Sequence, residues 1–409
     1  MSKHILLISY TFPPYPGIGG RRWAKFAKYL SRLGYTVHVI HAKNPFKEKS
    51  LWVKDIELNP NIKLYEAISL YPNILTVNPK SILQKIWYRI ALFIVNTFSK
   101  GTPYDKSSFW KRSMLETSID LINQFHIENV VVSCAPFSSA YHALELNKNF
   151  SDLNLVVDLR DPWTWGIGYG FANLKSEKLE YEKMMEHEVI KNCNYLLVPT
   201  SDMKDHLDIT YPSYFNKTVV IPHGFDKDEV VQTKKVHSKK TRCILYGTLY
   251  DKLDAIFENL ASVIKNLDTR ISLDIYSSAE TYKPSFERVQ LINNSVNYYP
   301  QLSPQDLFSK INLYDYVLII QPDYAKDFIT TKIYEIIYSG TPILLISKKG
   351  KLSEFISNNK LGLWIIPDDI SEKFESVLQF DYDYFKLKQF PIEDYSFETI
   401  TSNLIPYFK

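Results

Sequence analysis

Several features that define common protein classes are missing from this sequence. Its three cysteines, Cys134, Cys193 and Cys243, are far apart and odd in number, and each lies in or beside an apolar segment. Buried free thiols in a reducing compartment account for them, and no zinc-ligand spacing is present. No apolar run approaches the roughly 18 residues that a membrane-spanning helix needs, and the N-terminal apolar segment is too short for a signal peptide. We therefore expect a cytoplasmic protein.

Further absences narrow the kinds of ligand. The sequence has no Gly-x-Gly-x-x-Gly fingerprint, which argues against a dinucleotide-binding dehydrogenase. It has no recognised nucleic-acid-binding motif, so we expect no nucleic-acid partner. Neither a tandem repeat nor a low-complexity tract is present, and the chain therefore reads as ordinary globular protein.

The charge of the chain is small overall but unevenly distributed. Residues 1–116 contain 18 Lys and Arg and 6 Asp and Glu, a net charge of +12, whereas the remainder contains 30 and 39, a net charge of −9, and the two sum to +3. A basic N-terminal part indicates an anionic partner, and without a nucleic-acid motif a membrane surface is favoured. The length of 409 residues favours two domains of ordinary size.

The chain opens with the pattern of a βαβ unit. Residues 5–9 predict a buried strand, residues 10–20 a loop rich in proline and glycine, and residues 21–33 an amphipathic helix before the next strand. Gly19 and Gly20 allow the loop backbone to approach a ligand closely. Eleven residues are many for such a connection, which favours a functional loop over a plain one.

Residues 80–100 predict a helix that is apolar over most of its second half. Lys80, Lys85, Arg89 and Lys100 surround the apolar residues. A basic amphipathic helix with tryptophan and tyrosine is typical of a segment that lies on a membrane surface. The alternative is a helix that packs on the sheet, and the pattern favours neither.

Two later strands end in polar residues. The first, at residues 130–135, is followed by Ser138, which can cap the next helix. The second ends in Asp158-Leu-Arg160-Asp161-Pro-Trp163. An arginine beside two carboxylates at the carboxyl end of a strand is typical of a site for a polar ligand, and a local salt bridge is the alternative.

The alternation of strands and helices starts again after residue 241. A strand at 242–247 leads into a turn that contains Gly247, Thr248 and Lys252. Further strands are expected at 271–276, 316–320 and 343–346, and a last helix at 395–409. Residues 227–241, which are rich in Lys, Thr and Ser, read as the linker.

The most informative stretch runs from Asp327 to Pro342. Thr330 or Thr331 can cap a short helix that Gly340 and the following proline end. A helix that starts at the carboxyl end of a strand favours phosphate, because unpaired N–H groups and the helix dipole attract negative charge. Lys332 is placed to neutralise a phosphate, and Glu335, one turn later, to accept from a sugar hydroxyl. The alternative is an ordinary βαβ connection whose Lys and Glu are solvated.

These segments resemble the motifs of a known enzyme family. Asp327 and Glu335, followed by the Gly340-Thr-Pro342 turn, resemble the acidic pair of family-four (group 1) glycosyltransferases, although that family usually has Glu at both positions. The loop 10–20 resembles that family's Pro-Pro…Gly-Gly loop. The turn at 158–163 resembles one found in bacterial surface-polysaccharide members. The resemblance covers nearly the whole chain in the expected order.

The resemblance implies the GT-B architecture, two Rossmann-like α/β/α domains facing a central cleft. The expected divisions are an acceptor-side domain at 1–226, a linker at 227–241, a nucleotide-sugar-binding domain at 242–394, and a helix at 395–409 that crosses back to the first domain. The implied activity is a retaining hexosyltransferase of capsule or O-antigen synthesis. It transfers sugar from a nucleoside-diphosphate donor to a lipid-linked or growing polysaccharide acceptor, without metal or cofactor, at the inner face of the plasma membrane.

The resemblance also assigns roles to individual residues. The catalytic set is Asp327, Glu335 and Asp161. The donor-binding set is Gly19, Gly20, Gly247, Thr248, Lys252, Thr330, Thr331, Lys332 and Glu335. The acceptor-side set is Arg21, Ser138, Arg160 and Asp161. Two alternatives remain, a nucleotide-sugar epimerase-like enzyme on the same fold and a non-catalytic GT-B scaffold protein; Asp at 327 and Thr at 248 favour the scaffold.

Overall fold

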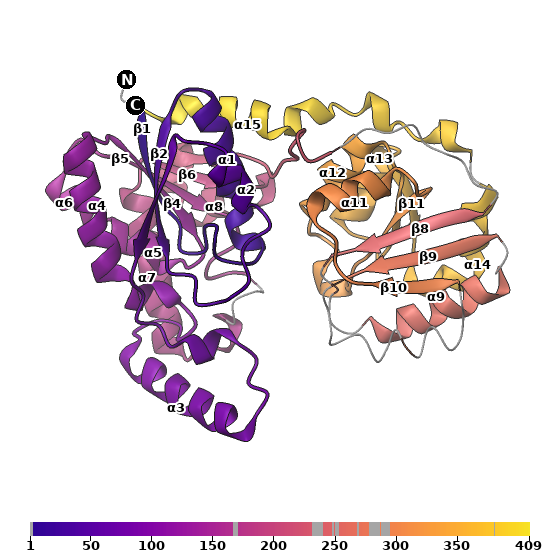
Figure 1. Cartoon of the computed structure of the whole chain (residues 1–409), viewed down its shortest axis with the longest axis horizontal. Coiled ribbons are helices and arrows are strands. Elements are labelled where there is room, and N and C mark those ends of the chain that lie inside the picture. The colour runs from indigo at the N-terminus through magenta and orange to yellow at the C-terminus, as the bar shows by residue number, and fades with distance from the viewer. Residues whose placement is uncertain are drawn as a thin grey trace. The chain divides into compact units, whose positions relative to one another are not determined.

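The computed structural model describes residues 3–166, 171–230, 240–247, 249, 253–267, 270–277, 287, 295–379 and 381–409. The chain forms two compact units, Met1–His223 with Phe397–Lys409, called the N-terminal unit, and Gly224–Ser396, called the C-terminal unit. Each unit is built around a parallel β-sheet with helices beside it (Figure 1). The α/β class expected from the alternating sequence pattern is therefore confirmed.

The N-terminal unit contains a seven-stranded sheet in the order β3-β2-β1-β4-β5-β6-β7. The strands are β1 His4–Ile8, β2 Thr36–Ala42, β3 Ile62–Ala67, β4 Asn129–Cys134, β5 Asn154–Leu159, β6 Tyr195–Val198 and β7 Thr218–Val220. β1 pairs with β2 on one side and with β4 on the other, so the strand order reverses between β1 and β4. Such a reversal is where open α/β sheets bind ligands, outside the carboxyl ends of the strands.

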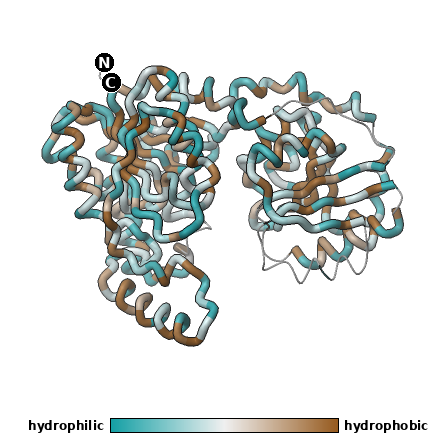
Figure 2. The backbone as a smooth tube through the Cα atoms, in the orientation of Figure 1, coloured by the Kyte–Doolittle hydropathy of each residue, from teal (hydrophilic) through white to brown (hydrophobic). Residues whose placement is uncertain are grey.

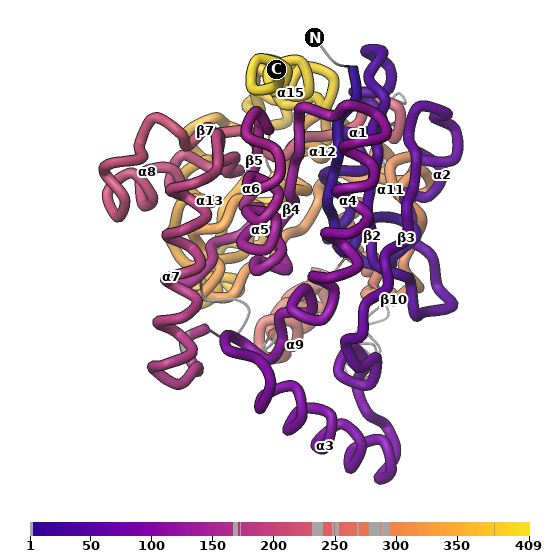
Figure 3. The backbone as a smooth tube through the Cα atoms, turned by 90° about the vertical axis from the view of Figure 1, so that its left-hand side faces the viewer, coloured from indigo at the N-terminus to yellow at the C-terminus, as the bar shows by residue number. Residues whose placement is uncertain are grey.

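Helices cover both faces of this sheet, which explains why its strands are almost continuously apolar. The helices of this unit are α1 Arg21–Arg32, α2 Val53–Glu57, α3 Ile82–Phe98, α4 Lys111–Phe125, α5 Ser138–Ala143, α6 Leu146–Asn149, α7 Ser176–Asn192, α8 Ser201–Thr210 and α15 Phe397–Leu404. One core includes Trp110 and Met114 of the α4 side, and the other includes Trp23 and Phe26 of α1. Figure 3 shows that α3 extends away from these layers.

The C-terminal segment completes the N-terminal unit. Phe397 of α15 packs edge-on against Phe26 of α1, with ring centroids 5.5 Å apart. The backbone N–H of Lys409 donates to the side-chain oxygen of Asn129 at 2.8 Å, beside the start of β4. Asn154, at the start of β5, donates to the carbonyl oxygen of Tyr407 at 2.8 Å. These contacts join the end of the chain to the amino ends of two central strands.

The C-terminal unit contains a six-stranded parallel sheet in the order β10-β9-β8-β11-β12-β13. Its strands are β8 Thr241–Tyr246, β9 Ile271–Tyr276, β10 Val296–Tyr299, β11 Tyr316–Ile320, β12 Ile343–Ile346 and β13 Gly362–Ile365. Its helices are α9 Asp254–Asn266, α11 Pro304–Ile311, α12 Lys332–Ser339, α13 Lys351–Asn358 and α14 Ile370–Lys373. β8 pairs with β9 and with β11, so this order reverses between β8 and β11.

Several further expectations can be compared with the structure. The three cysteines are buried and unpaired, as predicted. Among the residues that the structure describes, no helix is both long enough and apolar enough to cross a bilayer. Most of the expected linker lies outside the described residues, at 231–239. Just before the linker, Phe225 pairs with Ser396 in a parallel bridge.

Candidate functional site

The C-terminal unit presents a lysine at the point where its strand order reverses. α12 follows β11, and Lys332 is its first residue. The Lys332 ammonium donates a hydrogen bond of 2.8 Å to the carbonyl oxygen of Tyr246, the last residue of β8, and lies 5.2 Å from the centroid of the Tyr246 ring. A positive charge therefore lies at the carboxyl edge of the sheet, between the two strands where nucleotide phosphates bind in such folds.

Gly247 makes room for this lysine. Its φ of +88° is in the left-handed region, and a Cβ built on it would lie 2.4 Å from the Lys332 ammonium nitrogen and 3.0 Å from Cε. A side chain at this position would therefore strain the backbone and displace the lysine. Gly247, which the sequence predicted to contact the donor, thus leaves space for the Lys332 side chain. The sequence of the turn does not indicate this contact.

The start and end of α12 follow the predicted signals. The Thr330 hydroxyl accepts from the N–H of Lys332 at 3.2 Å, and the Thr330 carbonyl oxygen accepts from the N–H of Ile333 at 3.1 Å. Thr331 makes no side-chain capping bond, so of the two predicted threonines Thr330 is the cap. Gly340 ends the helix with a φ of +74°, as predicted. Thr330 therefore already accepts from two of the first N–H groups of the helix, which leaves the Lys332 side chain as the main donor of positive charge at this helix start.

Burial changes the titration of Lys332. Desolvation lowers its pKa to about 8, and the nearby Glu335 carboxylate opposes that shift. Near neutral pH the side chain is therefore a cation that is poorly solvated, and an anionic ligand would stabilise its charge. Glu335 is itself almost fully buried, one turn further along α12 on the same side as the lysine.

Asp327 has a clear structural partner. It is exposed, and its Oδ1 accepts from the backbone N–H of Lys351, the first residue of α13, at 3.0 Å. A Cβ on Gly350 would lie 2.9 Å from the same oxygen. Asp327 therefore joins the β11–α12 loop to the N-terminus of α13, where its negative charge is favourable.

Two further polar residues lie at the carboxyl edge of this sheet and were not among the predicted site residues. Gln321 follows β11 and Ser347 follows β12, and both are almost fully buried. The amide nitrogen of Gln321 donates to the Phe328 carbonyl at 2.9 Å, but its Oε1 and the Ser347 hydroxyl have no hydrogen-bond partner within the described part of the chain. Their position directly after apolar strands was the available signal. The predicted donor residues Thr248 and Lys252 lie outside the described residues.

In the N-terminal unit, Arg160, the first residue after β5, connects the end of β4 with the loop before α1. Its guanidinium donates to the carbonyl oxygens of Gly19, in the loop after β1, and of Cys134, the last residue of β4. It also donates to the Ala135 carbonyl at 2.9 Å. The alternative was a local salt bridge with one of the two neighbouring carboxylates, and of these Asp158 pairs with Arg22 instead, at 3.0 Å. Arg160 thus holds the loops around the strand reversal in place.

The two glycines of the first loop serve this packing. A Cβ on Gly19 would lie 2.9 Å from the Thr11 hydroxyl and 3.3 Å from the Arg160 guanidinium. A Cβ on Gly20 would lie 2.3 Å from the Thr11 carbonyl oxygen. The close approach that glycine permits is therefore, in this structure, an approach of the loop to itself and to Arg160.

A group of cations lies at the same edge. The buried Asp158 carboxylate accepts from the Arg22 guanidinium and, at 2.6 Å, from the Trp23 indole. Arg21 is buried with its guanidinium 5.8 Å and 5.7 Å from the ring centroids of Trp52 and Phe397. Burial, and then the charges of Arg22, Arg21 and Arg160, lower the pKa of His223 well below its usual value. His223 is therefore neutral near pH 7, as suits a structural histidine.

Ser138 belongs to a buried hydrogen-bond cluster. Its N–H and its hydroxyl donate to the two carboxylate oxygens of Asp105, at 2.9 and 2.8 Å, and its hydroxyl lies 2.5 Å from that of Ser107. Ser138 is the first residue of α5 and does not cap it; Asp105 accepts the first N–H instead. His142, in the same helix, is buried with neither ring nitrogen bonded to a described residue, and burial lowers its pKa to about 4.

Asp161 is half-buried and lies two residues after the end of β5. Two buried carboxylates of α7 accept hydrogen bonds from the residues that follow Asp161. Glu182 accepts from the Trp163 indole at 2.9 Å, and Glu186 accepts from the Thr164 hydroxyl at 2.5 Å. Desolvation raises the pKa of both glutamates to about 7. These residues carried no sequence signal, because α7 reads as a polar helix.

Comparison with known proteins gives a likeness of structure but not of sequence. No protein-family model matches the chain, and no curated protein matches it. Sucrose-phosphate synthase from Thermosynechococcus elongatus aligns over 98% of this chain and 97% of its own, with a TM-score of 0.63 and 14% identity. A glycosyltransferase from Rickettsia africae aligns over 99% and 97%, with a TM-score of 0.62 and 16% identity.

A third similar structure was solved with ligands. HepE from Anabaena, in complex with UDP and glucose, aligns over 98% of both chains with a TM-score of 0.59 and 11% identity. At such identities the likeness shows the fold alone. The chain therefore has the fold of the GT-B type, two Rossmann-like α/β domains, which is the fold expected from the sequence.

Proposed function

We propose that this protein is a glycosyltransferase that uses a nucleoside-diphosphate sugar as its donor. The observation that carries the proposal is the Lys332 ammonium at the reversal of the C-terminal sheet, with Gly247 leaving the space for it. The fold supports it, since structures of this fold include glycosyltransferases and one complex with UDP and glucose. We further propose a hexose as the transferred sugar, retention at its anomeric carbon, and membership of the family-four group, on the motif resemblance.

In this proposal the C-terminal unit binds the donor. Lys332 pairs with the diphosphate, and its charge stabilises the leaving group as the bond between the sugar C1 and the diphosphate oxygen breaks. Glu335 accepts hydrogen bonds from ribose or sugar hydroxyls. Asp327 faces the sugar while it caps α13, and the Gln321 amide and Ser347 hydroxyl offer further polar contacts at the same sheet edge.

The N-terminal unit binds the acceptor in this proposal. Asp161 orients the acceptor hydroxyl that forms the new bond to the sugar. Arg160, Ser138 and Arg21 have internal partners, so we assign them the positioning of the loops rather than direct contact. The acceptor class we propose is lipid-linked or growing surface polysaccharide, at the inner face of the plasma membrane.

The test is thermal unfolding with a panel of nucleoside diphosphates and nucleotide sugars. A ligand at a hundred times its dissociation constant adds about 2.7 kcal/mol of stability to the form that binds it. We expect one nucleotide to raise the unfolding temperature of the wild type, and Lys332→Met and Glu335→Gln to reduce that shift. Lys265→Met, an exposed lysine on α9, is the matched control and should keep it.

The outcomes separate the competing functions. No shift with any nucleotide, even with acceptor lipids added, would indicate a non-catalytic scaffold. Conversion of the bound donor to an epimer without any acceptor would indicate an epimerase-like enzyme. Transfer to an acceptor that survives in both Lys332→Met and Glu335→Gln would show that the donor site lies elsewhere.

A further inference from the structure

Helix α3 exposes its apolar face rather than burying it. Its main contacts are with the short helical turn at Asn73–Thr76 rather than with a strand, and most of its residues are exposed, so the expected alternative of a helix packed on the sheet is wrong. Only Ala91 and Val95 are buried, whereas Ile82, Leu83 and Phe93 are 77%, 80% and 72% exposed. Figure 2 shows this hydrophobic helix at the lower end of the N-terminal unit, away from the sheet.

The exposed residues form one continuous face. Successive residues of an α-helix are about 100° apart, so spacings of three and four residues lie on one side. Ile82, Ile86, Ile90 and Phe93 follow this spacing opposite the buried pair, and Leu83, Trp87, Ile94 and Phe98 widen the same face. Lys85, Arg89 and Asn96 lie along one flank of it. An apolar stripe with a basic border is typical of helices that lie in a membrane interface.

Side-chain hydrogen bonds hold both ends of the helix. Ser81 and Gln84 form a reciprocal capping box at its start. At its end, the Lys178 ammonium donates to the carbonyl oxygens of Asn96, at 2.9 Å, and Ser99, at 2.7 Å. Glu182, which like Lys178 belongs to α7, accepts from the N–H of Thr102 at 2.7 Å. Both ends of α3 are thus anchored by side-chain hydrogen bonds, while its apolar side chains are exposed.

The charge around α3 selects the partner. Between Glu66 and Asp105 the sequence contains four basic residues, Lys80, Lys85, Arg89 and Lys100, and no acidic residue. None of the four forms an ion pair with an acidic group in the described ranges of the chain. A second copy of the protein would bring two such basic segments together, which electrostatic repulsion disfavours. A lipid bilayer with an apolar interior and anionic headgroups matches both the apolar face of α3 and the basic residues beside it.

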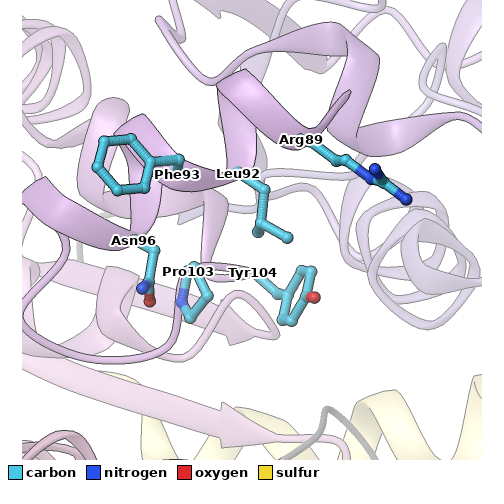
Figure 4. A pocket seen from close by; sticks show the side chains of 6 residues that line it. All are labelled: Arg89, Leu92, Phe93, Asn96, Pro103 and Tyr104. Carbon is cyan, nitrogen blue, oxygen red and sulfur yellow. The ribbon is translucent and has the colours of Figure 1, made fainter. Parts of the chain in front are cut away.

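A hollow beside α3 adds a place for a headgroup. It has a volume of about 400 Å³ and lies between α3 and the turn at Pro103 and Tyr104. Figure 4 shows Leu92 and Asn96 directed toward that turn, with Arg89 at one side. The hollow is open, its walls are mainly apolar, and Arg89 and Asn96 supply donors that suit a phosphate.

From these observations we propose that α3 docks the protein on an anionic lipid bilayer. The apolar face of α3 enters the interface, the basic flank contacts lipid phosphates, and the hollow at Arg89 accepts one headgroup. With 17 residues the helix is about 25 Å long, too short to span the bilayer, and it lies in the plane of the surface. The inference does not rest on the transferase reaction, because vesicle binding is measured without nucleotide or acceptor.

The test is flotation of the full chain with vesicles of phosphatidylcholine, with and without phosphatidylglycerol. We expect binding only to the anionic vesicles, weakened by salt. The variant Lys85→Gln with Arg89→Gln should reduce the partition coefficient roughly 25-fold, since each basic residue at the surface contributes about fivefold. Ile86→Gln with Phe93→Gln should reduce it by more than tenfold while the unfolding temperature stays unchanged.

The matched control places the same substitutions on an apolar pair elsewhere. Ile209→Gln with Phe215→Gln changes residues of α8 and the following turn that are also exposed, and should leave vesicle binding unchanged. The proposal is overturned if the wild type binds neither kind of vesicle or binds neutral and anionic vesicles equally well. It is also overturned if the α3 variants bind anionic vesicles as well as the wild type does. It is also overturned if sedimentation shows a wild-type oligomer that the Phe93 variant dissociates, because a second copy would then cover α3.

Discussion

The Lys332 ammonium and the Tyr246 carbonyl oxygen, 86 residues apart in the sequence, are joined by a hydrogen bond of 2.8 Å. The bond connects the first residue of α12 with the last residue of β8. It holds a long, flexible side chain in one place at the reversal of the strand order. The charge is therefore positioned before any ligand arrives, which reduces the entropy that binding would otherwise cost.

The first prediction concerns the pH dependence of nucleotide binding. Burial lowers the pKa of Lys332 to about 8, so the free protein loses this positive charge as pH rises through that value. The affinity for the nucleoside diphosphate should therefore fall as pH rises from about 7 to 9, by up to roughly tenfold per unit above the pKa. Titration calorimetry measures it. Lys332→Met should bind weakly throughout, and an equal fall in that variant would contradict the assignment.

The second prediction separates two glycines with similar backbone conformations. Gly247→Ala adds a Cβ 2.4 Å from the Lys332 ammonium nitrogen, so it should lower both stability and nucleotide affinity. Gly340→Ala meets no atom within 4 Å and should incur only the left-handed backbone strain, about 1–2 kcal/mol. Unfolding temperature and nucleotide affinity, measured on both variants, decide the matter. Equal affinities would show that Gly247 does not position the lysine.

The third prediction separates the structural and catalytic roles of Asp327. Asp327→Asn keeps an oxygen that accepts from the Lys351 N–H, so it should leave the stability nearly unchanged. Asp327→Ala removes that acceptor and should cost about 1 kcal/mol, as the loss of a helix-capping side chain does. If the carboxylate also acts on the sugar, the asparagine variant should bind nucleotide normally but transfer slowly. Wild-type turnover in that variant would limit Asp327 to capping α13.

The fourth prediction concerns the stability of the N-terminal unit. Desolvation raises the pKa of Glu186 to about 7, above its value in the unfolded chain, so the folded protein binds more protons between these values. Stability from this group is therefore present at low pH and declines as pH rises toward 7. Glu186→Gln should make thermal unfolding less dependent on pH between about 5 and 8, since the amide retains an acceptor for Thr164 and Tyr211.

The control for this fourth prediction lies on the same helix. Glu180 is exposed and pairs with Lys183 at 2.9 Å, so Glu180→Gln should leave the pH profile as in the wild type. If the unfolding temperature depended on pH in the same way in the wild type and in Glu186→Gln, burial of Glu186 would not be a cause of that pH dependence. A remaining slope is expected in Glu186→Gln, because burial also raises the pKa of Glu182 to about 7.

Much of the candidate site was predictable where local rules apply. The Thr330 cap, the Gly340 end and the start of α12 at Lys332 follow from hydrogen-bonding groups within a few residues. The polar residues Gln321 and Ser347 were also available to such a rule, since each directly follows an apolar strand, but they were passed over. In contrast, nothing near Arg160 indicates that its partners are the carbonyls of residues 19, 134 and 135.

The sequence by itself determined the α/β alternation, the two sheets and the amphipathic character of residues 82–98, because these depend on apolar periodicity and on turn residues. Only the tertiary structure decided which polar groups meet. Parallel strands bring distant carboxyl ends to one edge, so that Lys332 reaches β8 and Asp158 pairs with Arg22. Tertiary packing also decided that α3 turns its apolar face outward, since periodicity defines a face but not what covers it.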